Sequence, residues 1–318
     1  MTRHTTFRFT VVPTAFQVDA LRRHVGAARF AFNQCLQLVR AGLASKVEEG
    51  PCLPLPWSGF DLINAFNHWK LTDAAGLDES GKPGLPWRAQ VCQQVFEEAA
   101  VDLGNALAAF SAGRKGERRG KAARFPRFKK KTNARPSFRL RNKGAGAKSA
   151  IRVGVGDELR AIRLPKLGDL AVRECTRRLR GMLAKGRAKI LFATVSLRHD
   201  GRWQVTLNLA AAELHPARRH ADVTASPTVG IDRGLTTFAV VADDAGRERE
   251  RLHAPRPLRQ TLPKLRKASR AFSRKKGDSR NRARARSQLS RVHARIASIR
   301  NDFVHRESSR LARPTVAW

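Results

Sequence analysis

The sequence predicts an α+β protein with more than one domain. Its N-terminal third begins with a strand pattern over residues 5–12 and continues with helical spacing. Its middle part alternates like antiparallel strands, most clearly at 189–198 and 202–210. From residue 257 onward the spacing is helical again and the composition is strongly basic. Runs of strands that are separated along the chain from runs of helices are typical of this fold class.

The N-terminal third is predicted to be a small helical unit entered from a strand. Residues 5–12 alternate apolar and polar side chains, and Pro13 ends the run. A long helix is expected over 15–42, a short one over 59–71 and a second long one over about 87–110. One face of each long helix is apolar: Val18, Leu21, Val25, Ala28, Phe32, Cys35 and Val39 on the first, and Val91, Val95, Ala99, Leu103, Leu107 and Phe110 on the second.

The middle of the chain changes from a basic segment to strands. Residues 111–149 hold 15 Lys or Arg residues and a single acid, Glu117. Strand patterns resume at residue 151, and the tripeptide at 199–201, His-Asp-Gly, joins two alternating runs as a hairpin turn does. Residues 211–226 have the composition of a polar linker.

The C-terminal part is predicted to start with a strand hairpin and to end in two helices. Short apolar strands are expected at 228–233 and 237–243. Two antiparallel helices should follow, separated by a break at 277–279 in which Ser279 is a suitable N-cap. The second helix carries a seam with heptad-like steps of three and four residues: Leu289, Val292, Ile296, Ile299 and Phe303.

The charge of the chain restricts its partners. Its 318 residues include 63 Lys or Arg and 26 Asp or Glu, which gives a formal net charge of +37. Such an excess calls for a polyanion, either nucleic acid or an anionic membrane surface. A membrane-surface protein usually concentrates its charge on one amphipathic helix, whereas here Lys and Arg run through the whole chain. We therefore expect a nucleic-acid partner, no membrane partner and a cytoplasmic, nucleoid-associated location.

Asp232 ends the apolar strand Val229-Gly-Ile-Asp and precedes a turn with Gly234. A carboxylate at a strand end beside an exposed turn begins two related folds, the RNase H-like nucleases and the actin-like ATPases. The ATPase interpretation needs a second phosphate loop, but the 86 residues after Asp232 are mainly Arg-rich helices. We favour the nuclease-type interpretation, in which Asp232 is a metal-binding catalytic carboxylate. The competing interpretation is an ordinary turn aspartate, because Asp is common in turns.

Two basic segments are candidate nucleic-acid-binding surfaces. In the first, basic residues alternate with two Phe residues around Pro126. The cations suit phosphates, while the Phe rings either stack on bases or pack beneath the loop. The second is the helical segment 256–313, with 19 Lys or Arg residues and three acids. The residues predicted to bind are Arg124, Phe125, Arg127, Phe128, Lys129, Lys130, Lys131, Arg274, Lys275 and Lys276.

The cysteines and histidines show no ligand spacing. Cys35, Cys52, Cys92 and Cys175 lie far apart and form no C-x-x-C pair. We therefore expect neither a disulfide framework nor a zinc site in this chain.

The order of the motifs resembles the TnpB family, the transposon-encoded RNA-guided nucleases of bacterial insertion sequences. The resemblance extends from residue 1 to about residue 311. It depends on several segments in order: Trp87 to Phe96, Arg124 to Lys129, Ile162 to Gly168, Gly201 to Val205, Val229 to Leu235, Ser273 to Lys276 and Asp302 to Ala312.

The resemblance implies a fold, an activity and partners. A wedge-like β-barrel would be formed by residues 1–13 and 111–225, a helical recognition insert by 14–110, and the start of a RuvC-type, RNase H-like domain by 227–318. It also implies transposition-related DNA binding, with a guide RNA from the transposon end, a target DNA and Mg²⁺ held in part by Asp232.

The chain departs from the family pattern at its end. The family continues into a strand with a Glu, a zinc ribbon and a final Asp, whereas this chain stops after Arg-Pro-Thr-Val-Ala-Trp. We therefore expect a C-terminally truncated protein that binds RNA and DNA but has an incomplete nuclease site. Two alternatives stay open: an active Mg²⁺-dependent endonuclease, with carboxylates supplied by Asp243, Asp244 or another chain, and a remnant without function.

Overall fold

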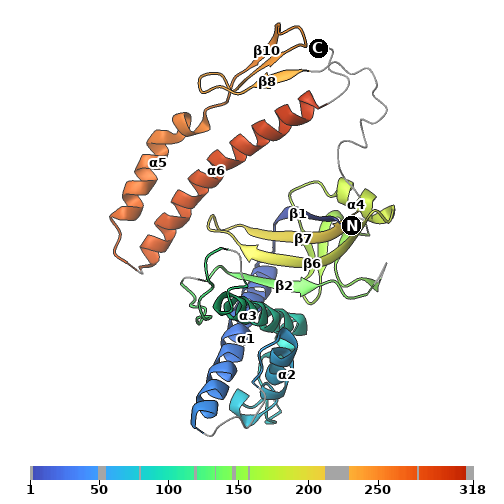
Figure 1. The fold of residues 1–318 in the computed structure, drawn as a ribbon, viewed down its shortest axis with the longest axis vertical. Helices are drawn as coiled ribbons and strands as arrows, with labels where there is room; N and C mark the ends of the chain where they lie inside the picture. The colour runs from blue at the N-terminus through green and yellow to red at the C-terminus, as the bar shows by residue number, and fades with distance from the viewer. Residues whose placement is uncertain are drawn as a thin grey trace. The chain divides into compact units, whose positions relative to one another are not determined.

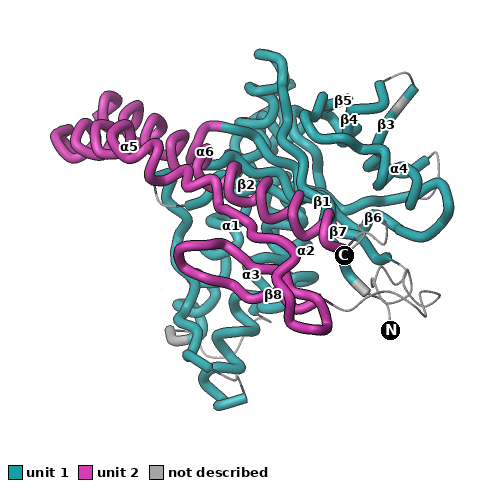
Figure 2. The backbone as a smooth tube through the Cα atoms, turned by 90° about the horizontal axis from the view of Figure 1, so that it is seen from above, with its two compact units in different colours: residues 1–198, 202–213 teal, residues 199–201, 214–318 magenta. Residues whose placement is uncertain are grey.

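The computed structural model describes residues 3–48, 55–78, 80–117, 120–132, 134–144, 148–156, 158–211, 229–277 and 279–312. The chain forms two compact units, drawn in teal and magenta in Figure 2. The first comprises Met1–Arg198 and Arg202–Glu213, and the second comprises His199–Gly201 and Leu214–Trp318. The expected polar linker at 211–226 lies almost entirely outside the described residues.

Three helices of the first unit gather around an aromatic core. They are α1 (Ala15–Glu48), α2 (Gly59–Trp69) and α3 (Gln93–Arg114), which lie together below the sheet in Figure 1. Short 3₁₀ turns occupy Asp73–Ala75 and Arg88–Gln90. The second long helix, α3, therefore begins later than the expected residue 87. The backbone of Val91, just before it, is extended. The core includes a cluster of ring contacts among Phe30, Phe66, Trp69, Trp87 and Phe96.

The main sheet of the first unit brings the two ends of this unit's chain together. Its strand order is β1 (Arg3–Val11), β7 (Trp203–Ala211), β6 (Ala188–Leu197) and β2 (Ser137–Arg141), all antiparallel. The alternation predicted for the second arm of the hairpin is confirmed, because Trp203, Val205, Leu207 and Leu209 are all buried. The polar residues that alternate with these four along the strand face away from the core.

The strands of the first unit do not close into a barrel within the part of the chain that is described, so the expected wedge-like β-barrel is wrong in that respect. A second sheet contains β3 (Arg152–Val155), β4 (Glu158–Leu164) and β5 (Gly168–Ala171), and α4 (Arg177–Ala184) follows it. Among the residues that the structure describes, one isolated bridge, Val11 to Val172, links the two sheets. Closure needs continuous pairing around the ring, and β2 and β3 belong to different open sheets.

A buried histidine connects α1 to the start of α3. His24 is 1% exposed, its Nδ1 lies 2.7 Å from the carbonyl oxygen of Ala20, and the backbone N–H of Cys92 donates to its Nε2 at 3.2 Å. Since Nε2 accepts, the ring is neutral with its proton on Nδ1. Burial lowers the pKa of His24, while the bond to Ala20 opposes this.

His24 should make the stability of the protein depend on pH. Because its pKa is lower in the folded state, the unfolded chain takes up the proton first. This contribution is complete above the unfolded pKa of about 6.5 and declines as the pH falls below it. Urea unfolding between pH 5 and 8 should therefore show a steeper acid-side loss for the native protein than for His24→Gln. Parallel curves for the two proteins would contradict this.

The second unit is a small sheet on a helical hairpin. The strand order is β10 (Glu248–Leu252), β9 (Ala239–Ala242) and β8 (Gly230–Asp232). Two predicted strands are confirmed in shortened form. The strand β10 was not predicted, because its sequence Glu-Arg-Glu-Arg-Leu is almost wholly charged. It forms at an edge of the sheet, where polar side chains remain in water.

The predicted antiparallel helices are α5 (Pro257–Ser273) and α6 (Arg280–Leu311). Ser279 caps α6, since its side chain accepts a hydrogen bond from the backbone N–H of Arg282. The predicted seam faces inward, with Ile296 buried and the other four members half-buried. Near its end, α6 packs on the sheet: Phe303 meets Phe238 edge to face at 5.0 Å, and Leu311 joins a cluster with Val241.

Candidate nucleic-acid interface

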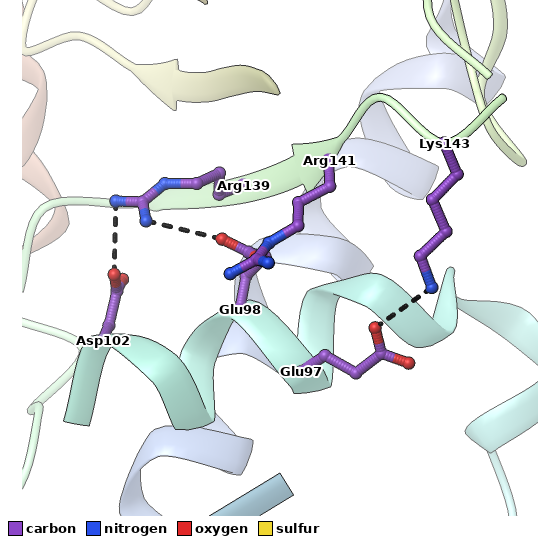
Figure 3. Close-up of polar contacts among 6 residues, drawn as sticks. All are labelled: Glu97, Glu98, Asp102, Arg139, Arg141 and Lys143. Atoms are coloured by element: carbon purple, nitrogen blue, oxygen red, sulfur yellow. Dashed lines mark hydrogen bonds and ion pairs between the residues drawn. The ribbon is translucent and has the colours of Figure 1, made fainter. Parts of the chain in front are cut away.

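The acids of α3 pair with cations on β2 and just after it, as Figure 3 shows. Glu98, whose side chain is 4% exposed, contacts Nη1 of Arg139 at 3.4 Å and also pairs with Nε of Arg141. Asp102 contacts Nη2 of Arg139 at 3.2 Å, and Glu97 contacts Lys143 at 3.4 Å. These cations therefore attach a strand to a helix, and much of their charge is already compensated within the unit.

The loop between α3 and β2 uses two of its predicted binding residues as anchors. The ring of Phe125 meets that of Phe110, on α3, edge to face at 5.3 Å. The ammonium of Lys129 lies 3.6 Å from the centre of the Phe32 ring, and its backbone exchanges hydrogen bonds with the side chain of Asn33. Burial lowers the pKa of Lys129, and the nearby Asp102 carboxylate opposes this. Both side chains are half-buried, so each has a packing role.

The other cations of this loop point into solvent. Arg124, Arg127, Lys130 and Lys131 are exposed, and none takes part in an ion pair among the described residues. We call these four side chains the loop cations. Phe128 is 38% exposed and carries the guanidinium of Arg40 at 4.6 Å from its ring centre. The contact with Arg40 was not predicted, because 88 positions separate the two residues in the sequence.

The second unit presents a cationic surface on its helical hairpin. Arg274, Lys275 and Lys276 are exposed where α5 ends. Further exposed cations occupy the helix faces that point away from the apolar seam. The basic composition of this segment is visible in the sequence, but its exposed positions depend on how the two helices pack: Arg259, Lys264, Arg266, Lys267, Arg270, Arg280, Arg284, Arg286, Arg295 and Arg300.

Asp232 lies at the end of β8 and is exposed. Among the described residues, no group of three or more His, Cys, Asp or Glu side chains is arranged to hold a metal ion. Two-metal hydrolysis requires several carboxylates around ions about 3.5–4 Å apart. The described residues therefore do not fit the Mg²⁺ site that the resemblance implies.

The strand register also separates Asp232 from the acids that follow β9. Asp232 pairs with Val240 and Gly230 with Ala242, so Asp243, just after β9, lies three residues beyond the position opposite Asp232. At about 3.3 Å per residue, that is roughly 10 Å along the strand. Asp243 is also occupied in the next turn: it accepts from the backbone N–H of Arg247 at 2.8 Å and from Arg249 Nε at 3.0 Å.

The thiols of the described cysteines have no catalytic setting. Cys35 and Cys92 are buried and Cys175 is exposed, while Cys52 lies outside the described residues. Burial raises the pKa of Cys35 to about 12, so its thiol stays protonated at neutral pH. Its Sγ donates to the carbonyl oxygen of Leu62 at 3.8 Å, which is a packing role.

Within the described residues, no helix is both long and apolar enough to span a lipid bilayer. The fold and its surfaces define a mixed α/β protein with two groups of exposed cations.

Two family models match parts of the sequence. The model described as "Probable transposase", of the OrfB type from the IS605 group, matches residues 211–316, and its "Helix-turn-helix domain" matches residues 1–43. In the structure, the second match covers β1 and the first part of a single continuous helix, α1.

Curated relatives cover nearly the whole chain. A Mycobacterium tuberculosis protein named "Putative RNA-guided DNA endonuclease Rv2885c" is 31% identical over 307 residues, 96% of this chain. The Escherichia coli protein "Putative RNA-guided DNA endonuclease InsQ" is 26% identical over 318 residues, 98% of this chain. This chain spans 63% and 64% of their lengths, respectively. These matches confirm the resemblance to the TnpB family that the motifs of the sequence indicated.

Among solved structures, a Cas12f1 chain from a complex with sgRNA and target DNA covers 98% of this chain at 10% identity, with a TM-score of 0.29.

Proposed function

We propose that this protein binds a guide RNA and a DNA target as part of RNA-guided DNA recognition by a transposon-encoded system. The names of its curated relatives support this proposal. The observation that carries it is the division of cations in the structure. Arg139 and Arg141 are paired with carboxylates, whereas the loop cations and the exposed cations of α5 and α6 are available for phosphates.

The exposed Phe128 suits the same function. A ring with one face covered by Arg40 can offer its remaining exposed part to an unpaired base, because aromatic stacking accepts any base. Phe125 is packed against Phe110 and is therefore assigned to anchoring the loop.

Salt dependence tests this proposal directly. Binding of a structured RNA should weaken steeply as the salt concentration rises, because each neutralised phosphate releases condensed counterions. A plot of log affinity against log salt should be linear, with a slope of several units. A flat plot, or a failure to bind structured RNA at low salt, would contradict the proposal.

DNA cleavage is a second candidate function, supported by the word endonuclease in the names of the relatives. Asp232 is the residue on which it depends in this chain. We expect Asp232→Ala to leave RNA affinity unchanged, because a single exposed carboxylate is not a phosphate-binding group. Guide-programmed cleavage of a plasmid by the native chain, lost in Asp232→Ala, would establish the endonuclease.

A further inference from the structure

A cavity of about 300 Å³ lies in the first unit between α1, α3 and the segment leading into β2. Part of its wall is apolar and is formed by Val25, Ala28, Val95, Ala99 and Phe138. Its volume is at the lower end of the range for small-molecule sites, and such sites combine apolar walls with a few polar groups. The cavity is therefore large enough for one small planar group with a polar attachment, and too small for a base pair.

The charged part of the wall favours an anion that also donates hydrogen bonds. Four cations and two carboxylates line the cavity, an excess of two positive charges: Arg29, Lys129, Arg135 and Arg139 against Glu98 and Asp102. Glu98 is already occupied by Arg139 and Arg141. The Nε of Arg139 is buried without a hydrogen-bond partner among the described residues.

Asp102 keeps capacity for a ligand. Its side chain is 40% exposed, and the contact with Arg139 uses only one acceptor position. A carboxylate has about four such positions on its two oxygens, so it can accept two parallel bonds from one ligand. Guanine is the base that presents two adjacent donors, N1–H and the N2 amino group, on its Watson–Crick edge. Adenine, cytosine and uracil each present a single kind of donor there.

We propose that this cavity binds one unpaired guanine nucleotide. The base would lie against the apolar wall with its N1–H and N2 amino group donating to Asp102. The phosphate would lie toward the guanidinium groups of Arg29 and Arg135, which suit phosphate oxygens. The nucleotide is either free in solution or a single extruded residue of a bound strand. Only in the second case does the proposal rest on the proposed nucleic-acid function.

Calorimetric titration of the full chain with GMP, IMP and AMP at low salt tests the base preference. IMP keeps N1–H but lacks the N2 amino group, and AMP lacks both donors. GMP should bind more tightly than IMP, and at least about tenfold more tightly than AMP, because each bond to a charged acceptor is strong. Equal affinities for GMP and AMP, or no binding of GMP, would overturn the proposal.

Variants connect the preference to the cavity. Asp102→Asn should remove the preference for GMP over AMP. The matched control is Asp19→Asn on α1, which also removes an aspartate that pairs with an arginine, at 3.5 Å, but lies outside the cavity. A cavity-filling change, Ala28→Leu, should abolish binding of all three nucleotides while thermal unfolding shows the protein still folded. If the preference for GMP over AMP survives in both Asp102→Asn and Ala28→Leu, the site lies elsewhere and the assignment is overturned.

A second experiment shows whether the nucleotide is free in solution or part of a bound strand. It also tests this proposal separately from the proposed function. Two RNA hairpins that differ only in a single bulged base, G or A, are compared for affinity. A preference for bulged G that is lost in Asp102→Asn assigns the cavity to a bound strand. Equal affinity for both hairpins, with the free GMP preference intact, assigns it to a free nucleotide. If neither hairpin binds, the proposed function fails while the GMP result stands.

Discussion

Replacing the loop cations Arg124, Arg127, Lys130 and Lys131 together by Gln should weaken the binding of structured RNA by roughly a hundredfold at physiological salt. Each phosphate contact contributes about 0.7–0.9 to the slope of log affinity against log salt. Losing four contacts should therefore flatten that slope by about 3. The four side chains are exposed and pair with no carboxylate of the described residues, so the fold should not depend on them. Fluorescence anisotropy at several salt concentrations measures both quantities.

The control is a variant with the same change in net charge. Arg22, Arg249, Arg251 and Arg306 are exposed or half-exposed, but each already has a carboxylate partner. Replacing these four by Gln should leave the salt slope almost unchanged, because their charges are locally compensated. Equal losses in both variants would show that only the net charge matters and that the loop is not a contact surface.

The second large effect concerns the folded state itself. We expect Glu98→Ala to lower the free energy of unfolding by about 2–3 kcal/mol, because it leaves Arg139 and Arg141 side by side without their shared carboxylate. Removing one partner of a fully buried pair costs about 3–5 kcal/mol. The smaller value is expected here because the arginines are 31% and 56% exposed and water screens them in part. Urea denaturation provides the measurement.

Glu97 provides the matched control on the same helix. Its partner Lys143 is 63% exposed and lies 3.4 Å away, so Glu97→Ala should cost less than about 1 kcal/mol. If the two alanine variants are equally stable, Glu98 does not hold β2 on α3, and the contacts in Figure 3 contribute little to stability.

Much of the fold follows from the pattern of apolar residues along the chain. Wherever one face of an element is buried, its period appears in the sequence. The alternation in β7 and the seam of α6 both correspond to buried faces in the structure. The hairpin between β6 and β7, the cap of α6 at Ser279 and the general position of each long helix depend on local signals of the same kind.

The tertiary structure alone determined the features that depend on distant partners. The charged strand β10 has no periodic apolar signal and exists because β9 supplies its hydrogen bonds. The expected barrel does not close within the described residues, because closure depends on pairing between strands that are far apart in sequence.

The same holds for the basic residues. The sequence alone determined that this chain is a strongly basic α+β protein with two cation-rich segments. Only the structure distinguished Arg139, which two acids of α3 hold, from Arg127, which is exposed. It likewise distinguished Phe125, which packs on α3, from Phe128, which reaches solvent. The reason is physical: composition sets the number of charges, whereas the charge available to a ligand depends on which carboxylates the fold brings within reach.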